Sequence, residues 1–446
     1  MRVLPFIILP ASLILLSSTC NKVPPTPEPD MSAYEGLVIN EIAAHDQTVD
    51  AVSWVELLNA GAKEVSLDGL GLFITDEYFN GRQIFTGSGS LAAGERLLVS
   101  TADGSLTTGI ASNAQFILRL GTKEGTVDAF DRSADCEQTL YDRGSFQRIP
   151  DGTATWKALP YNSKGKENQV FDLNAQNHTA IWVWNSHIPS WLEDDCKSMK
   201  NLYSLGYRHI LLNAAAFSPS NKRRTLQFME AAEEMGWTIH AWMQCFYNGG
   251  WVSPVDDENK CYREDIYERI RTNARSYVEE YGVKGLHLDY IRFGGTAYKH
   301  NPSTEVNAIG AVNRCCREIR EIADSFDAGI VTSAALMPEI NSTEYYGQSP
   351  SQMGKYLHIL MPMIYRYSYG YSDASCQRVA NWFADNSGDA QMWSGIQTYI
   401  GNDDHVDPMN AEQIRKDIDL FMDTRGNGIV LFRYGLGTFP DVNDIK

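Results

Sequence analysis

Hydrophobic and polar positions divide the chain into two parts with different periods. Between residues 36 and 160, apolar and polar residues alternate over short runs such as "WVELLNAG" and "ERLLVSTAD", each bounded by Gly, Asp, Asn or Ser. Alternation at period two predicts half-buried β-strands, and short strands at this spacing are typical of a β-sandwich. We therefore expect a β-sandwich over residues 36–160.

From about residue 178, short apolar runs alternate with amphipathic stretches in which apolar residues recur three and four positions apart. The expected strands are 180–185, 209–215, 238–244, 284–290, 329–335, 358–365, 392–399 and 428–434. Eight strands joined by right-handed crossovers predict an α/β (β/α)8 barrel of the TIM type over residues 178–446. An open doubly wound sheet is the alternative, and it is less favoured because no glycine-rich phosphate turn follows the first strand.

The chain ends about a dozen residues after the last expected strand. The eighth helix is therefore expected to be missing or vestigial, and another segment must cover that face of the barrel. The candidates are the linker at residues 161–177, which joins the two expected domains, and the sandwich itself.

The first twenty residues have the composition of a targeting segment. Arg2 is followed by the apolar stretch "VLPFIILPASLILL" and then by "SSTC". A Cys directly after such a region resembles a bacterial lipoprotein signal peptide, residues 1–20, with Cys20 as the lipidated residue. The alternative is an ordinary secretory signal in which Cys20 has no role. Residues 21–35 predict a stiff, Pro-rich linker, so we expect a protein tethered through lipid alone in the bacterial cell envelope, at the outer membrane or cell surface.

Charge and cysteine usage narrow the range of partners. The net charge of the 446 residues is −18, whereas nucleic acids and anionic membrane surfaces attract a positive field. The Cys residues beyond Cys20 include no CxxC pair, so they encode neither a disulfide framework nor a zinc site plainly. We expect no metal, no cofactor and no nucleic-acid partner, and the sequence leaves the oligomeric state open.

The stretch "GVKGLHLDYIRF" at residues 282–293 places charged residues inside an expected buried strand. In (β/α)8 barrels the active site lies at the carboxyl ends of the strands, where Asp289 falls. A buried charge is costly unless it is paired or used, so Asp289 is the first candidate for a catalytic carboxylate. The alternative is an ion pair with Arg292 that only fixes the end of the strand. His287 and Arg292 are placed to tune the charge state of Asp289.

A glycosidic bond is commonly cleaved by two carboxyl groups, one donating a proton and the other acting as nucleophile or base. Glu339 is the second candidate because it follows the next strand, and neighbouring strands lie about 5 Å apart. It is equally consistent with a loop carboxylate in solvent. The reserve candidates are Asp403, Asp404 and Asp407, after the seventh expected strand.

Polar and aromatic residues at other strand ends are expected to form a ring around the same mouth. The expected substrate-binding residues are Trp184, Asn213, His240, Trp242, Gln244, His287, Tyr290, Arg292, Tyr365 and Tyr399. Aromatic faces stack on the apolar faces of sugar rings, and amides bond hydroxyl groups, so this composition favours a carbohydrate ligand. For His240 and His287 the alternative is a hydrogen-bonded histidine in the core.

Five segments follow one another in the first part: "VINEI", "WVELLNAGAKEVSLDGLGL", "LAAGERLLV", "VDAFD" and "SFQRIPDGTATW". In this order they resemble the lamin-tail domain, an immunoglobulin-like sandwich, over residues 36–160. The resemblance implies a module that binds or positions and does not catalyse, here as a spacer or targeting unit.

Three segments of the second part, "GWTIHAWMQCFY", "GVKGLHLDYIRF" and "HILMPMIY", resemble strands three, four and six of the glycosyl-hydrolase-like family 10 barrels. The resemblance spans about residues 180–435 and implies that Asp289 is the catalytic-type carboxylate. The family includes bacterial envelope lipoproteins, some implicated in cutting peptidoglycan strands that have lost their stem peptides. The departures are Gln244 and Cys245 in place of Asn-Pro, Met363 in place of a common Gln, and Gly294 in place of the Pro after the strand-four motif. They put the substrate in question more than the fold.

Together these features predict a lipid-anchored glycoside hydrolase that cleaves a polysaccharide by carboxylate acid/base chemistry, with peptidoglycan glycan strands implied by the resemblance. One alternative is a non-catalytic glycan-binding protein that kept the barrel and lost a carboxylate. Another is a metal-dependent hydrolase such as a deacetylase, which needs a cluster of ligands that the spacing of the strand-end histidines does not provide.

Replacing Cys20 tests the expected anchor. Cys20→Ala should release the protein from the membrane fraction, because the lipid is its expected attachment, and should leave the activity of the barrel unchanged. Cell fractionation followed by immunoblotting measures the distribution. A variant that remains in the membrane fraction would show that the lipoprotein interpretation is wrong.

Overall fold

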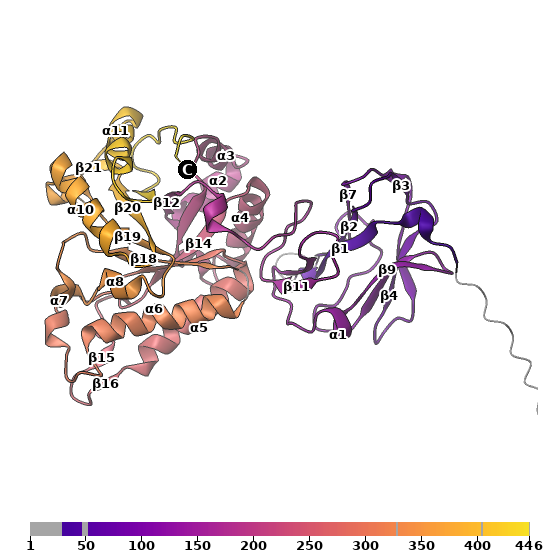
Figure 1. The fold of residues 1–446 in the computed structure, drawn as a ribbon, viewed down its shortest axis with the longest axis horizontal. Helices are drawn as coiled ribbons and strands as arrows, with labels where there is room; N and C mark the ends of the chain where they lie inside the picture. Colours follow the sequence, from indigo (N-terminus) through magenta and orange to yellow (C-terminus); the bar gives the residue numbers. More distant parts are fainter. Residues whose placement is uncertain (1–28, 47–51, 327–328, 403–404, 446) are drawn as a thin grey trace, which may run out of the picture.

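The computed structural model describes residues 29–46, 52–326, 329–402 and 405–445. They form two bodies side by side, a β-sandwich and a barrel, joined by residues 161–177 (Figure 1). The expected signal peptide with Cys20 lies outside the described residues, as do Asp403 and Asp404. None of the helices in the described ranges combines the length and apolar character that crossing a membrane requires.

The first body consists of two antiparallel sheets, which confirms the predicted β-sandwich. The sheets have the orders β11-β10-β1-β2-β7 and β5-β4-β8-β9, and β3 pairs with β6. The strands are β1 (Leu37–Asp46), β2 (Val52–Asn59), β3 (Val65–Ser66), β4 (Gly71–Thr75), β5 (Arg82–Thr86), β6 (Ser90–Leu91), β7 (Arg96–Ser100), β8 (Ile117–Gly121), β9 (Thr126–Asp131), β10 (Ser145–Arg148) and β11 (Trp156–Leu159). Ile42, Leu72 and Phe130 are among the apolar side chains buried in its core.

The second body is a closed barrel of eight parallel strands in chain order, as predicted. The strands are β12 (Thr179–Val183), β13 (His209–Asn213), β14 (Thr238–Gln244), β17 (Gly285–Asp289), β18 (Val331–Leu336), β19 (Ile359–Pro362), β20 (Gln391–Gln397) and β23 (Gly428–Phe432). Parallel pairing of β23 with β12 closes the ring, so the open-sheet alternative is wrong.

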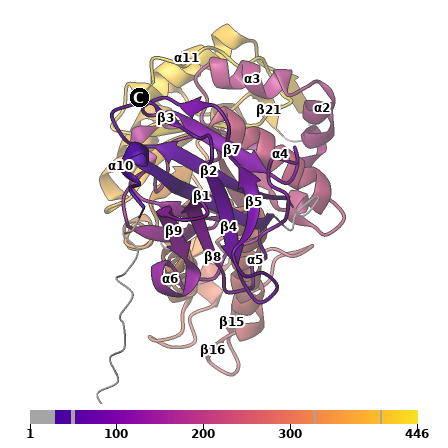
Figure 2. The same cartoon turned by 90° about the vertical axis from the view of Figure 1, so that its right-hand side faces the viewer.

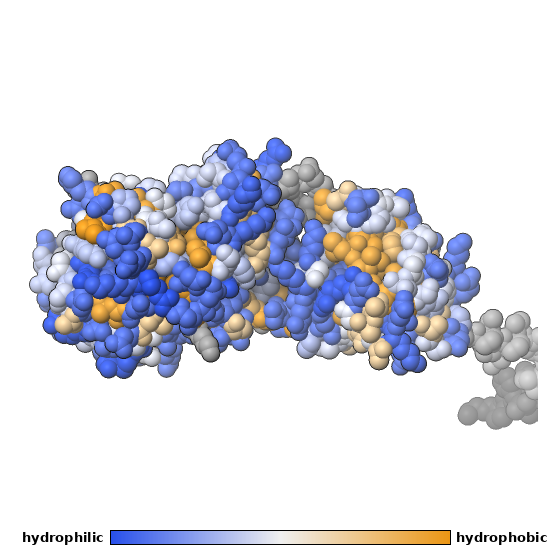
Figure 3. Space-filling view, turned by 90° about the horizontal axis from the view of Figure 1, so that it is seen from above, coloured by the Kyte–Doolittle hydropathy of each residue, from blue (hydrophilic) through white to orange (hydrophobic). Residues whose placement is uncertain are grey.

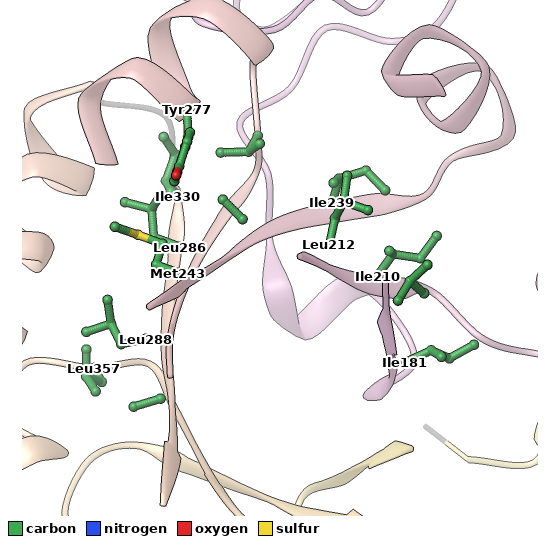
Figure 4. Packing of buried hydrophobic residues seen from close by; sticks show 14 of the residues in the cluster. Ile181, Ile210, Leu212, Ile239, Met243, Tyr277, Leu286, Leu288, Ile330 and Leu357 are labelled. Atoms are coloured by element: carbon green, nitrogen blue, oxygen red, sulfur yellow. The ribbon is translucent and has the colours of Figure 1, made fainter. Parts of the chain in front are cut away.

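Helices surround the barrel and begin and end where the sequence permits. The larger ones are α3 (Lys197–Ser204), α4 (Lys222–Met235), α5 (Glu264–Tyr281), α6 (Ala308–Ser325), α10 (Asp373–Asn386) and α11 (Ala411–Met422). The α4 and α5 helices each stop at a glycine with positive φ, Gly236 at 87° and Gly282 at 61°. Outward-facing strand residues such as Ile210, Ile239 and Leu286 form the apolar core between strands and helices (Figure 4).

The interior of the barrel is filled by a second apolar cluster that includes Trp182, Trp242 and Trp393. At the amino-terminal end of the strands, Phe171 and Leu173 of the linker pack against this cluster. The linker is fixed there through side chains, since Thr238 Oγ1 donates to Gln176 and Gln391 Nε2 donates to Asn174 at 2.9 Å each. These contacts of linker residues 171–176 close the amino-terminal end of the barrel.

No helix follows β23 in the described chain, which extends to Ile445. Val442 and Ile445 instead join the core between strands and helices, and Val442 N donates to Leu205 O at 2.7 Å. The C-terminal segment itself therefore covers the face that an eighth helix would cover. The expectation that the linker or the sandwich covers this face is wrong, because the irregular C-terminal segment buries Val442 and Ile445 there.

The sandwich contacts the barrel at the ends of helices. Arg143 forms an ion pair of 3.1 Å with Glu233 of α4, and Asp142 N donates to Glu279 O of α5 at 3.2 Å. The view from the sandwich side shows it in front of the barrel (Figure 2), and the view from above shows a largely hydrophilic barrel surface and an apolar patch on the sandwich (Figure 3).

A buried carboxyl group connects the linker to the sandwich. Glu41 of β1 is fully buried and accepts hydrogen bonds from Ser145 Oγ at 2.5 Å and from Ser163 N at 2.9 Å, and Ser163 Oγ lies 3.0 Å from its second oxygen. Burial raises the pKa of Glu41 to about 8, because a charged carboxylate loses its hydration there. Between pH 4.5 and 8 the folded protein therefore holds a proton at Glu41 more tightly than the unfolded chain does.

Glu41→Gln should reduce the stability loss that accompanies rising pH, because it removes the contribution of Glu41. The wild type loses stability from about pH 4.5 to pH 8, because the unfolded chain releases the proton of Glu41 first. Glutamine reproduces the shape and hydrogen bonds of the protonated acid, so the two proteins should unfold alike near pH 4.5. Above pH 8 we expect the variant to be more stable by roughly 2–4 kcal/mol. Urea unfolding at a series of pH values measures the difference, and Glu35→Gln, an exposed glutamate, is the control. An equally steep decline in both proteins would contradict the role of Glu41.

Candidate active site

A cavity of about 570 Å³ opens at the carboxyl ends of the barrel strands, a size typical of ligand pockets. Most of the predicted site residues lie on its wall: Trp184, Asn213, Trp242, Gln244, Asp289, Tyr290, Arg292, Tyr365 and Tyr399. They come from β13, β14 and β17, from the turns after β12, β17 and β19, and from β21 (Tyr399–Asn402), which follows β20. Closure of the parallel sheet brings these ends together, because every strand of a parallel barrel points to the same rim.

Asp289 is the last residue of β17 and is held by two hydrogen bonds. Its Oδ2 accepts from Trp242 Nε1 at 2.8 Å, and its Oδ1 accepts from Tyr290 N at 2.7 Å. Burial raises the pKa of Asp289, while the bonds from Trp242 and Tyr290 and the positive charge of Arg292 act in the opposite direction. The net result is a carboxyl group in the cavity that keeps its proton to higher pH than an exposed aspartate.

Tyr290 adopts a left-handed backbone conformation with φ at 52°, which a residue with a large side chain rarely occupies. This conformation accompanies the bond from its own N–H to Asp289 Oδ1, one residue earlier. Strained backbone of this kind is concentrated at functional sites, where the surrounding structure maintains it.

The guanidinium of Arg292 stacks on aromatic rings, 4.5 Å from the centroid of Trp251 and 5.5 Å from that of Tyr346. Its Nη1 donates to Phe293 O at 3.3 Å. The described side chains record no ion pair between Arg292 and Asp289, so the alternative of a purely structural pair at the strand end does not describe this site.

His240 and His287 lie below the cavity in the interior of the barrel, and both are fully buried. His240 Nε2 is 3.1 Å from His209 Nδ1, and His287 Nδ1 is 2.9 Å from Ser333 Oγ. Burial lowers the pKa of each histidine to about 3, so both are neutral at physiological pH. The expectation that they contact substrate is corrected: they are core histidines one layer beneath the wall.

Glu339 is not on the wall of this cavity. Its Oε1 accepts from Tyr346 Oη at 3.1 Å, and it borders a separate, much smaller pocket behind Met337. The chain leaves the strand direction after Leu336, where Met337 N donates to Gln348 Oε1 at 3.0 Å, and this bend carries Glu339 behind the wall. The structure therefore places Glu339 beside the cavity and not on its wall.

The reserve carboxylates divide between two cases. Asp407 is exposed in β22 (His405–Pro408) and does not line the cavity, although the adjacent Val406 does, while Asp403 and Asp404 are outside the described residues. Among the described residues that line the cavity, Asp289 is the single one with a carboxyl group. Within the same described ranges, no three His, Cys, Asp or Glu side chains gather in a way that could hold a metal ion.

Several wall residues escaped the sequence interpretation. They include Trp182, Met337, Ser368, Tyr369, Asn402, Val406, Phe432 and Leu436. Tyr365 stacks on Phe432 with centroids 5.2 Å apart, and Arg433 lies 3.6 Å from the ring centroid of Trp184. The one usable signal was the run "YRYSYGYS" at residues 365–372, whose tyrosines indicate a loop that lines a site.

No protein-family model matches the chain, and a search of curated protein sequences gives no significant match. Solved structures show distant similarity to glycoside hydrolase barrels. The glycoside hydrolase domain of PgaB (BpsB) from Bordetella bronchiseptica has 11% identity and a TM-score of 0.45, covering 57% of this chain and 94% of that one. The spore cortex-lytic enzyme SleL from Bacillus cereus has 14% identity and a TM-score of 0.43, covering 62% and 74%. A chitinase from Rhizomucor miehei has 11% identity and a TM-score of 0.38, covering 57% and 94%.

Trp242→Phe should raise the pKa of Asp289 further. The substitution removes a hydrogen bond that stabilises the carboxylate, while the burial that disfavours the charge remains. The ¹³Cγ shift of labelled aspartates, followed against pH and assigned with Asp289→Asn, measures the change. Trp184→Phe alters the same wall at a ring stacked on Arg433 and should leave this pKa where it is. An unchanged or lower pKa in Trp242→Phe would contradict the assigned role of the indole.

Proposed function

We propose that this protein is a glycoside hydrolase in which Asp289 donates the proton to the leaving oxygen of a polysaccharide. The observation that carries the proposal is the setting of Asp289: a carboxyl group of raised pKa in a solvent-open cavity, fixed by Trp242 and the N–H of Tyr290. A general acid must hold its proton until the transition state and must keep a fixed orientation, and this setting supplies both.

The composition of the wall supports a sugar ligand. Trp184, which is 39% exposed, and Tyr365 line the cavity together with the polar side chains of Asn213 and Gln244. Rings of this kind cover the apolar faces of a pyranose, and amide groups bond its hydroxyls. A sugar bound to these groups displaces water from the cavity and places its glycosidic oxygen next to the carboxyl group of Asp289.

One carboxylic acid is sufficient where the sugar supplies the nucleophile. Asp289 gives its proton to the glycosidic oxygen as the C1–O bond breaks, and the carbonyl oxygen of a 2-acetamido group forms a bond to C1. Water then attacks C1 and reopens that ring, while Asp289 takes the proton of the water. This route favours glycans built from N-acetylhexosamines, and peptidoglycan glycan strands are the substrate that we propose.

A polysaccharide without acetamido groups would require a second carboxylate. Asp403 and Asp404, the reserve candidates from the sequence, are outside the described residues. The location in the cell envelope, the lipid at Cys20 and the targeting role of the sandwich belong to the same proposal.

Asp289→Asn tests the function. On peptidoglycan strands stripped of stem peptides, on chitin oligosaccharides and on deacetylated chitosan, we expect turnover of the acetylated glycans by the wild type. The variant should lose at least about 100-fold in turnover, because the proton donor is gone, and should still bind the glycan. Glu339→Gln is the matched control, since that carboxylate lies behind the wall, and it should retain nearly full turnover.

Two outcomes would overturn the proposal. Unchanged turnover in Asp289→Asn would exclude Asp289 as the acid. Glycan binding by the wild type without turnover of any of these polymers would identify a glycan-binding protein instead of an enzyme.

A further inference from the structure

An aromatic surface adjoins the cavity on the loops that follow β14 and β17. It consists of Tyr247, Trp251 and Tyr290, here termed the aromatic shelf. Tyr247 stacks on Tyr290 with centroids 4.8 Å apart, and Trp251 lies edge-on to Tyr290 at 5.6 Å. Trp251 is 45% exposed, whereas Tyr290 also lines the cavity. The shelf thus continues the wall of the cavity outward into solvent.

Trp251 is held in place although its ring is exposed. The guanidinium of Arg292 lies 4.5 Å from its centroid, and an antiparallel bridge joins the backbone of Tyr247 to that of Trp251. Val252 N donates to Phe246 O at 3.1 Å and closes the same turn. A ring that is fixed before a ligand arrives loses little conformational freedom on binding.

Gly294 makes room for the indole. A Cβ atom at position 294 would lie 2.9 Å from both Cε2 and Nε1 of Trp251, closer than such atoms normally approach. The position that departs from the Pro of the strand-four motif is therefore occupied by the residue that Trp251 requires. The replacement of that Pro by Gly294 and the position of Trp251 in the shelf therefore belong together structurally.

We propose that the aromatic shelf is a subsite for sugar residues of the same polysaccharide chain that lie outside the cavity, so that the protein prefers long glycans to short fragments. The proposal rests on the proposed function for the nature of the ligand. Its basis is the continuity of the shelf with the wall that holds Asp289, since Tyr290 belongs to both. The guanidinium of Arg292 covers one face of the indole, and the exposed part of the ring offers an apolar surface of the kind that packs against the apolar face of a pyranose.

Binding to glycans of two lengths tests the shelf without dependence on catalysis. In the Asp289→Asn background, isothermal titration calorimetry would use peptidoglycan strands stripped of stem peptides and chitohexaose as long probes, with the disaccharide of each as the short probe. Trp251→Ala should weaken binding of the long probes at least about tenfold, the effect of truncating a well-seated Trp, and should change binding of the disaccharides less than about twofold.

Two further variants sharpen the comparison. Gly294→Ala should displace the indole and weaken long-probe binding in the same direction, and circular dichroism would verify its fold. Tyr78→Ala removes an aromatic ring that is 73% exposed on the sandwich and should leave both affinities unchanged. If Gly294→Ala does not fold, Trp251→Ala decides the matter alone, because its ring is exposed and its removal leaves the core intact.

The failure of the shelf and the failure of the enzyme can be told apart. Undiminished binding of the long probes by Trp251→Ala, equal losses for long and short probes, or no long-probe binding in the parent background would each overturn the shelf. Length-dependent binding that Trp251→Ala abolishes supports the shelf even if no glycan is turned over. Turnover by the wild type that is indifferent to chain length and to Trp251 would leave the enzyme and remove the shelf.

Discussion

Pairing between β23 and β12 is the constraint on which the rest of the structure depends. It closes eight parallel strands into a ring, so that every strand delivers its carboxyl end to one rim and its amino end to the other. Backbone hydrogen bonds fix that arrangement independently of the side chains at either rim. The two rims can therefore differ. The linker fills the rim at the amino-terminal ends of the strands, and the rim at their carboxyl ends opens into the cavity that holds Asp289.

The raised pKa and the accessibility of Asp289 both follow from its position along the barrel axis, at the carboxyl end of its strand. One layer lower, His287 and His240 are sealed in the interior, lose their charge to burial and bond only to their neighbours. At the rim, water reaches the cavity while Trp242 and Tyr290 still fix the carboxyl group. Burial that is strong enough to raise its pKa, yet incomplete enough to admit a ligand, exists only in a narrow band near the strand ends.

The repeating features of the structure, its strands and their faces, could be predicted from the sequence. The burial depth of a residue and the contacts made by loops could not. Eight apolar runs at regular spacing predicted the strands, and a charge inside one of them predicted Asp289. Alternation along a strand shows that His287 and Asp289 share a face, but it does not show how far each lies from the open end of the barrel. The sequence therefore could not distinguish His287, a core residue, from Asp289, a residue of the cavity wall. Glu339 was misplaced because a bond from Met337 N to Gln348 bends the chain after β18, and no local pattern encodes a partner eleven residues ahead. Trp251 stood in a loop without any period, and its significance depends on an atom that Gly294 lacks.

The contact between sandwich and barrel sets a direction for the whole molecule. Glu233, Glu279 and Phe326, which meet Arg143, Asp142 and Tyr141 of the sandwich, lie at the C-terminal ends of their helices. Helices of this barrel run opposite to its strands, so the sandwich sits under the closed rim and the open rim points the other way. The amino-terminal domain and the open rim of the barrel therefore lie at opposite ends of the described molecule. A ligand can therefore reach the cavity from the side of the barrel that the sandwich leaves open.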